Sequence, residues 1–123
     1  MEHIMQRLEK LRSLKEGWLD GEGEAISNPA ITRTEALFRD SYNKQFQMTC
    51  IYPVVEGGLL IEGDYDNKTF SIDIDENGFV EFFMMNFKDN SYIVFDKTDK
   101  IDIISERMQI LLKYMGYTKE LEI

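Results

Sequence analysis

The stretch DIDENG has the spacing of a calcium-binding loop, with oxygen-bearing side chains at Asp73, Asp75 and Asn77 followed by Gly78. Such a loop also requires a bidentate glutamate at its twelfth position and a helix on each side. Counted from Asp73, the twelfth residue is Met84, and the flanking segments TFSIDI and FVEFF alternate as strands do. DIDENG therefore indicates a tight turn between two strands rather than a calcium site.

Paired carboxylates offer a second chemistry, metal-assisted phosphoryl transfer. Acidic residues lie on or near two neighbouring predicted strands: Glu62, Asp64, Asp66, Asp73 and Asp75. Pairs of this kind can hold magnesium, and a nuclease usually sets them beside a lysine in an acid-x-Lys order on a strand. No such triplet occurs on the predicted strands, and Lys68 falls in a turn. We interpret the acids as a solvated strand face.

Other catalytic groups are scarce. The only histidine, His3, lies near a chain end that is expected to fray, so a histidine-based triad or a zinc site lacks its side chains. Cys50 lies in the apolar segment TCIY, which predicts a core thiol rather than a nucleophile. GEGEA lacks the third glycine and the preceding strand of a phosphate-binding loop. We expect no enzymatic activity and no cofactor.

Composition limits the classes of partner. The 123 residues include 23 acidic and 14 basic ones, for a formal net charge of −9, and 43% are hydrophobic. The hydrophobic content suits one folded domain, residues 1–123. The excess of acid argues against direct contact with nucleic acid or an anionic membrane, because both need clustered Lys and Arg. A single cysteine, a charged N-terminus and the lack of a long apolar run predict a cytoplasmic protein.

Hydrophobic periodicity predicts three helices. One is expected over residues 2–15, and a second starts at Pro29, with Ser27 or Asn28 as its cap, and runs to about Tyr42. Thr98 or Asp99 should cap the last helix, over about 100–115, and Gly116 should end it. The apolar side of this last helix should be formed by Ile101, Ile104, Met108, Leu111 and Met115.

Between the second and third helices the apolar residues alternate. Strands are expected at 47–55, 59–65, 69–75, 79–87 and 92–95, joined by short turns. The element order predicts an α+β fold, in which two N-terminal helices precede an antiparallel four- to five-stranded meander sheet and one C-terminal helix packs on the sheet.

The turn at DIDENG sets the pairing of the strands on either side of it. A three-residue loop, ENG with Gly78 in the left-handed conformation, places Ile74 opposite Val80. A two-residue loop would place Ile74 opposite Glu81 and turn the apolar side chains to the wrong face. We therefore expect the three-residue loop.

The second face of this hairpin is mixed. Acids lie towards the turn, and the bulky apolar residues Phe83, Met85 and Phe87 lie further along, so the strand at 79–87 is apolar on both faces. We expect a helix of the same domain to cover the second face. The alternative is an exposed apolar patch with an acidic rim, covered by a partner.

A glycine-rich segment, GWLDGEG, precedes the second helix and predicts an irregular loop around Trp18. We expect Trp18 to tuck under the sheet or the first helix, with the glycines letting the backbone turn around it. As an alternative, the loop is a recognition element bearing Trp18, Asp20 and Glu22.

LKEGWLDGEGEAIS, the proline-started helix after it and GGLLIEGDYDNKTFSIDIDENGFVEFF resemble a group of small bacterial and phage proteins with no settled activity. That group carries a Gly-Trp-Asp-Gly-x-Gly loop, a helix, a Gly-Gly strand and an acidic hairpin closed by Asp-Gly or Asn-Gly. The resemblance spans about residues 14–83. Here Leu19 is inserted in the loop, and Gly63 follows Glu62 where the group often has a tryptophan. Such genes often accompany mobile elements and defence systems, which implies an antitoxin, immunity or anti-defence role.

These patterns predict a non-enzymatic acidic interaction module that binds a basic protein, such as a nucleic-acid-handling one, and blocks its positively charged groove. The expected partner-binding residues are Asp64, Asp66, Asp73, Asp75 and Glu81, which would stand in for phosphates, with Phe83, Met85, Phe87, Trp18, Asp20 and Glu22. Two alternatives remain: a metal-dependent enzyme that uses the strand carboxylates, and a homo-oligomer, such as a homodimer, joined through the apolar residues.

Overall fold

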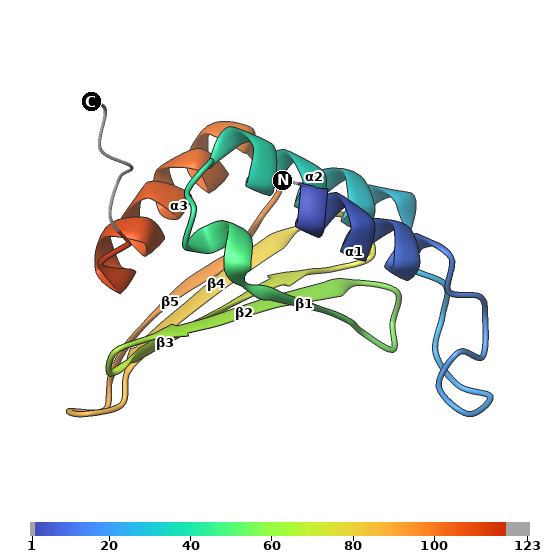
Figure 1. Ribbon diagram of the computed structural model, residues 1–123, viewed down its shortest axis with the longest axis horizontal. Coiled ribbons are helices and arrows are strands. Elements are labelled where there is room, and N and C mark those ends of the chain that lie inside the picture. The colour runs from blue at the N-terminus through green and yellow to red at the C-terminus, as the bar shows by residue number, and fades with distance from the viewer. Residues whose placement is uncertain (1, 118–123) are drawn as a thin grey trace.

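A computed structural model describes residues 2–117 as three α-helices laid on one face of a five-stranded antiparallel sheet (Figure 1). The helices are α1 (Glu2–Arg12), α2 (Asn28–Asp40) and α3 (Ile101–Met115), with a short 3-10 helix, η1 (Phe46–Met48). The strands are β1 (Cys50–Pro53), β2 (Leu59–Tyr65), β3 (Lys68–Ile74), β4 (Val80–Asn86) and β5 (Ser91–Thr98), and each pairs with the next along the chain. The predicted α+β meander is confirmed.

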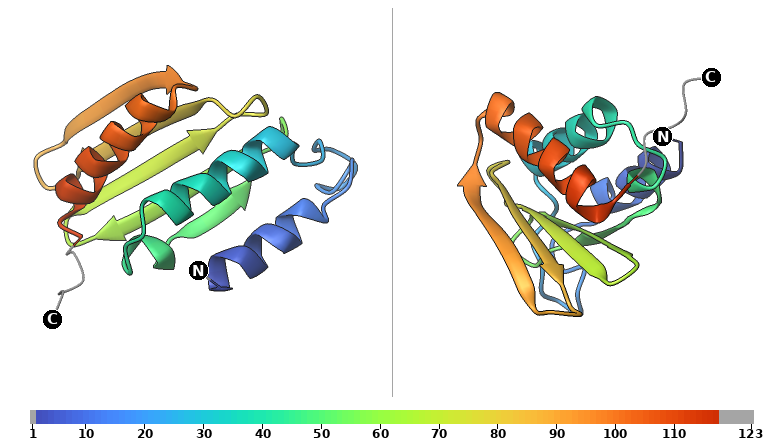
Figure 2. Two further views of the ribbon diagram at one scale, coloured as in Figure 1. Left: turned by 90° about the horizontal axis from the view of Figure 1, so that it is seen from above. Right: turned by 90° about the vertical axis from the view of Figure 1, so that its left-hand side faces the viewer.

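The helices form a single layer. α1 packs beside β1, α2 over β2 and β3, and α3 over β3, β4 and β5, as the views from above and from the end show (Figure 2). No helix within residues 2–117 lies on the opposite side of the sheet, which we call the open face. We expected a helix of the same domain to cover the second face of β4. For the described part of the chain this expectation is wrong, because all three helices pack on the other face of the sheet.

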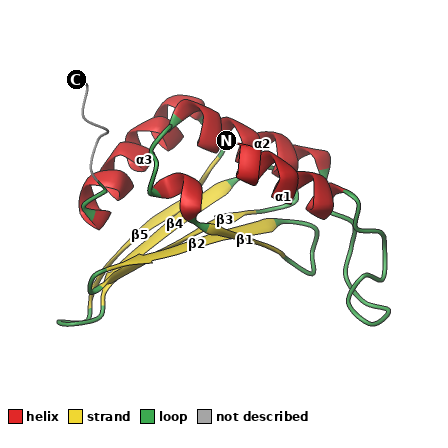
Figure 3. Ribbon diagram, viewed as in Figure 1, coloured by secondary structure: helices red, strands yellow, loops and turns green. Residues whose placement is uncertain are grey.

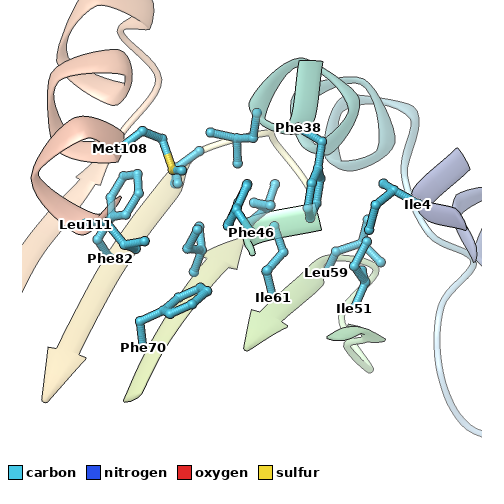
Figure 4. Close-up of a cluster of buried hydrophobic side chains, with 14 of the residues drawn as sticks. Ile4, Phe38, Phe46, Ile51, Leu59, Ile61, Phe70, Phe82, Met108 and Leu111 are labelled. Atoms are coloured by element: carbon cyan, nitrogen blue, oxygen red, sulfur yellow. The ribbon is translucent and has the colours of Figure 1, made fainter. Parts of the chain in front are cut away.

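The core lies between the helix layer and the sheet (Figure 4). Alternate strand residues point into it, among them Ile61, Phe70 and Phe82, and all three are fully buried. Phe38 of α2 stacks on Phe46 of η1 with ring centroids 4.5 Å apart, and Phe46 contacts Phe70 at 6.1 Å. This aromatic row joins α2, η1 and β3, and burying each ring contributes roughly 1.5–3 kcal/mol.

The β3–β4 hairpin has the predicted register. Ile74 pairs with Val80, and Asp73 pairs with Glu81. Gly78 adopts φ 84°, the left-handed conformation that closes a three-residue loop, and its N–H donates to the Asp75 carbonyl at 2.9 Å. The hairpin interpretation of DIDENG is confirmed.

The turn is also tied to α2. The Ser27 side chain caps α2 by accepting from the Ala30 N–H, as predicted, and its hydroxyl donates to the Glu76 carbonyl at 2.8 Å. The Arg33 side chain donates to the carbonyls of Gly78 and Asp99 at 3.1 Å each. The start of α2 therefore holds both the β3–β4 turn and the end of β5.

Several element boundaries differ from expectation, among them the end of α1, which is at Arg12 rather than at residue 15. The predicted strand at 47–55 is shorter, because Asn43 accepts hydrogen bonds from the backbone of Gln45 and Phe46 and starts the η1 turn instead. β5 extends to Thr98, so the α3 N-cap is Lys100 and has no side-chain cap. Ile101 is 68% exposed, because the first turn of α3 has not yet come over the sheet, whereas the other four residues of the predicted apolar side are buried.

Gly63 marks a departure from the pattern of the resembling group. A Cβ atom at this position would lie 2.6 Å from the Phe70 ring and 2.9 Å from the Thr49 methyl group. Phe70 and Thr49 thus occupy the space that a larger side chain would need.

None of the helices within residues 2–117 combines the length and apolarity needed to cross a membrane.

The short helix η1 provides a matched test of the core. Phe46→Ala should lower the free energy of unfolding by about 3–5 kcal/mol, because a fully buried ring is removed from the aromatic row. Met48→Ala, at a residue 72% exposed in the same turn, should change it by less than about 0.5 kcal/mol. Urea unfolding followed by circular dichroism measures both. Equal losses would show that Phe46 does not belong to the core.

Candidate functional site

The strand register sets three rows of side chains on the open face. The first row runs across the whole sheet through Cys50, Glu62, Ser71, Phe83 and Val94. The second contains Tyr52, Leu60, Asp73 and Glu81, and the third contains Asp64, Thr69, Met85 and Tyr92. Acids therefore gather on β2, β3 and the start of β4, and apolar groups gather on the rest of β4 and on β5.

Most of the net charge of the protein belongs to the sheet and its turns. The segment from Glu56 to Asp99 holds eleven of the 23 acidic residues but only three of the 14 basic ones, Lys68, Lys88 and Lys97. Its formal charge of −8 compares with −9 for the whole chain. The basic side chains are concentrated on the helix side of the molecule, so the open face has an unbalanced negative field.

The acidic end of the open face is hollowed. A depression of about 570 Å³, which we call the acidic hollow, lies between the β1–β2 and β3–β4 turns. Its lining includes Asp73, Asp75, Glu81, Glu56, Glu76 and Asp96, with Lys97 as the one cation among the described residues that line it. The Lys97 Nζ lies 3.7 Å from Asp75 Oδ2, and both groups reach solvent, so this pair adds little stability.

Asp73 is the acid of this group whose ionised form the folded protein disfavours. Its carboxylate reaches solvent, yet partial burial raises its pKa above 3.8, and repulsion from Glu62 raises the pKa further. The register also places it directly opposite Glu81, and like charges across a strand pair are destabilising. The free protein therefore holds a carboxylate whose ionised form it disfavours.

Asp75 has a structural task in the turn. Its Oδ1 accepts hydrogen bonds from the backbone N–H groups of Asn77 and Phe79, at 2.9 and 3.0 Å. Only Oδ2, next to Lys97, is left to face a partner.

Of the predicted acids, Asp73, Asp75 and Glu81 come together at the acidic hollow, whereas Asp64 and Asp66 lie at the other end of β2 and in the β2–β3 turn.

The predicted apolar residues occupy the open face in part. Phe83 and Met85 are half-buried on β4, and Phe83 stacks on Tyr92 of β5 with centroids 6.1 Å apart. Phe87 lies beyond the end of β4 and is 54% exposed. Tyr92, at 66% exposure, and Val94 complete the patch. Both residues lie in the strand expected at 92–95, but their place beside Phe83 and Met85 depends on the register of β4 with β5, which was not predicted from the sequence.

The Trp18 loop is separate from the sheet (Figure 3). The Trp18 Nε1 donates to the Glu24 carbonyl at 2.7 Å, and a Cβ atom at Gly23 would lie 2.7 Å from the indole. Trp18 therefore packs within its own loop, and the expectation that it tucks under the sheet or α1 is wrong. Asp20, with φ 50°, and Glu22 are exposed at the tip. The loop is anchored to the β1–β2 turn through Glu24 N–H to Val55 O, at 2.8 Å.

The remaining candidates for chemistry do not converge. Cys50 is exposed, because its side chain points from β1 to the open face. The prediction that Cys50 is a core thiol is therefore wrong. His3 is exposed on α1. Asp64 and Asp73 are four register positions apart, on the order of 13 Å. Among the described residues, no group of three or more His, Cys, Asp or Glu side chains is placed to hold a metal ion.

The two edge strands are partly capped by arginines. On β1 the Arg7 guanidinium donates twice to the Ile51 carbonyl, at 3.0 and 2.8 Å. On β5 the Arg107 guanidinium donates to the Asp96 carbonyl at 2.6 Å and lies over the Phe95 ring at 5.0 Å. The open face offers a broader contact surface than either edge.

In comparisons with known proteins, the chain matches no family model, no curated sequence and no solved structure. The chemistry of the site therefore rests on its own geometry. The open face combines a negative field with partly exposed aromatic and apolar side chains, which are the components of many protein interfaces.

Neutralising Asp73 should stabilise the free protein. Because its pKa is raised in the folded state, the folded protein binds more protons than the unfolded chain above pH 3.8, and stability falls as pH rises through that window. Asp73→Asn should therefore unfold at a higher temperature than the parent at pH 7. The gain in the free energy of unfolding should be at most about 0.2–1 kcal/mol, the range typical of cross-strand pairs. The difference should vanish near pH 3.

Thermal melts at several pH values measure this effect. Asp66→Asn is the matched control, because it removes the same charge from an exposed turn where a left-handed Asn is well tolerated. An Asp73→Asn gain that persists unchanged at pH 3 would contradict the electrostatic explanation.

Replacing Asp75 should separate its structural task from any binding role. Asp75→Ala removes the acceptor of two backbone hydrogen bonds and should cost about 1–2 kcal/mol, whereas Asp75→Asn keeps an acceptor and should cost less than half of that. Chemical denaturation of the two variants measures the difference. If both were as stable as the parent, the turn would not depend on the carboxylate.

Proposed function

We propose that this protein is a non-enzymatic interaction module that binds a basic protein through the open face. The observation that carries the proposal is the concentration of negative charge on a sheet face that no described helix covers. A positively charged, nucleic-acid-handling protein suits such a surface, because carboxylates at the acidic hollow can take the place of phosphates. On this proposal the protein acts in the cytoplasm as an inhibitor, in an immunity, antitoxin or anti-defence setting.

Electrostatics support binding over mere solubility. Scattered surface acids would serve solubility, but Asp73 lies beside Glu62 and opposite Glu81, where repulsion destabilises the free fold. A cationic partner would relieve that repulsion, so part of the strain would return as binding free energy. Residues that reduce stability in the free protein are typical of functional surfaces.

The apolar patch supplies the other half of an interface. Phe83, Met85, Tyr92 and Val94 are contiguous by register, and the acids lie to one side of them. Interfaces commonly combine an aromatic centre with a polar rim, and aromatic anchors provide much of the affinity. The acids would then guide the approach and orientation of the partner.

Self-association through this same face is less favourable. Packing two open faces together would confront the acids of one copy with those of the other, unless only the β5 side were buried. A metal-dependent reaction is the weaker alternative, because the carboxylates considered for it are spread along the sheet. Light scattering and a thermal shift with calcium, magnesium or manganese address these two alternatives.

Charge reversal on the open face should abolish binding of the partner, and the binding of the parent protein should weaken as the salt concentration rises. The test variant is Glu81→Lys with Asp96→Lys, both exposed at the acidic hollow. The protein is used as bait in native host lysate at low and high salt. We expect one stoichiometric partner that binds the parent protein at low salt, is released at high salt, and is lost from the double variant.

The matched control is Glu9→Lys with Glu106→Lys, which makes the same change in net charge on exposed positions of α1 and α3. It should retain the partner. Equal loss from both double variants would indicate a general charge effect, and retention by both would refute the acidic-face interaction.

A further inference from the structure

A second depression lies at the corner of the sheet where β1 stops pairing. The β1–β2 ladder ends at the Cys50–Glu62 pair, so Gly63 to Tyr65 have a strand neighbour only on the β3 side. The space that β1 leaves is a hollow of about 490 Å³, which we call the tyrosine notch. It is lined by Tyr52, Tyr65 and Tyr117, by the carboxylates Glu62 and Asp64, and by Met48.

The aromatic walls are held by the fold. Gly116 ends α3 in the left-handed conformation, φ 71°, and the Tyr117 N–H then donates to the Leu112 carbonyl at 3.1 Å. This helix stop directs Tyr117 back to the sheet, where its ring meets Tyr65 edge-on at 5.9 Å and Phe70 edge-on at 6.2 Å. Tyr65 and Tyr52 remain partly exposed, so aromatic surface stays accessible.

The notch is negative and has no built-in counterion. No Lys or Arg is among its described lining residues, and neither Glu62 nor Asp64 takes part in an ion pair within residues 2–117. Burial raises the pKa of Tyr117 to about 12, and the nearby Asp64 charge contributes to that rise. The Asp64 carboxyl group therefore lies close to a phenol that stays neutral, and both groups line the hollow.

Aromatic faces and carboxylates around one hollow are the groups that bind organic cations. A guanidinium or ammonium group gains from the quadrupole of aromatic rings and from charge-assisted hydrogen bonds to carboxylates. We propose that the tyrosine notch receives a cationic side chain, an arginine or a lysine, of the basic partner. This inference rests on the proposed function and names the group that the partner inserts at this corner.

The test begins with free side-chain analogues. The isotopically labelled protein is titrated with Nα-acetyl-arginine methylamide at about 0.15 M salt, where surface charges are well screened. We expect saturable shifts of the Gly63, Asp64 and Tyr65 amides with weak affinity. The neutral citrulline analogue, which has nearly the same shape, should cause none.

Variants identify the groups responsible. Asp64→Asn should weaken binding of the arginine analogue about tenfold, and Tyr65→Leu about fivefold. Tyr65→Phe keeps the ring and should bind like the parent, and Glu106→Gln, at an exposed acid on α3 outside the notch, is the matched control for charge. Retained amide spectra confirm that each variant is folded. Equal shifts with citrulline, or unchanged binding by Asp64→Asn, would overturn the proposal.

The exposed thiol of Cys50 gives an independent readout, because it lines the notch and is the only cysteine of the chain. The arginine analogue should slow its reaction with a neutral thiol reagent in the parent protein and in Glu106→Gln, but not in Asp64→Asn. No protection in the parent at a saturating concentration would also refute the site.

The partner assay distinguishes this inference from the proposed function. If the partner is retained by Asp64→Asn and Tyr65→Leu but lost from Glu81→Lys with Asp96→Lys, the proposed function stands and the inserted side chain is refuted. If all three variants lose the partner while Glu106→Gln keeps it, both are supported. Binding of the free analogue without any partner would leave a cation site and refute the acidic-face interaction.

Discussion

Two hydrogen bonds within the β3–β4 turn set the arrangement of the whole sheet. The Asp75 carboxylate accepts from the backbone of Asn77 and Phe79, and Gly78 closes the loop in a conformation that favours glycine. Because strand side chains alternate with a period of two, this loop length decides which residues enter the core and which form the open face. A one-residue slip would bury Asp73 and expose Ile72. The bonds from Ser27 and Arg33 then orient α2 over the same turn.

Helix packing accounts for the division between the two faces. Once α1, α2 and α3 cover one side, the residues of opposite parity stay in contact with solvent. On β2 and β3 those positions are mostly polar or acidic, as expected for a one-sided antiparallel sheet. On β4 beyond Glu81 and on β5 before Asp96 they are apolar instead, with Phe83, Met85, Tyr92 and Val94. The open face thus departs from the usual alternation only where it would meet a partner under the proposed function.

Sequence reasoning worked best where local chemistry decides the structure. The ENG loop, the Ser27 cap, the Gly116 stop and the register of the hairpin follow from turn residues and periodicity over a few positions.

Sequence reasoning failed where contacts between distant residues determine the structure. Phe46 joins the core through a 3-10 turn that depends on Phe38 and Phe70, and Cys50 faces outward because the shortened β1 has that parity. The absence of a helix over the open face of β4 within residues 2–117 also could not be predicted, since strand apolarity on both faces is compatible with cover from within or from outside. The tyrosine notch joins residues from four segments, so no local motif marks it.

The arginine caps on the sheet edges have a consequence for the concentrated protein. Unpaired strand edges are templates for intermolecular cross-β growth, and β1 presents its Ile51 carbonyl to solvent unless Arg7 covers it. Pro53, at the end of the same strand, offers no N–H to an incoming chain. An aromatic open face would otherwise make stacking of such aggregates favourable. By covering one edge carbonyl, the Arg7 guanidinium therefore disfavours the addition of a further strand at β1 while the apolar part of the open face stays exposed.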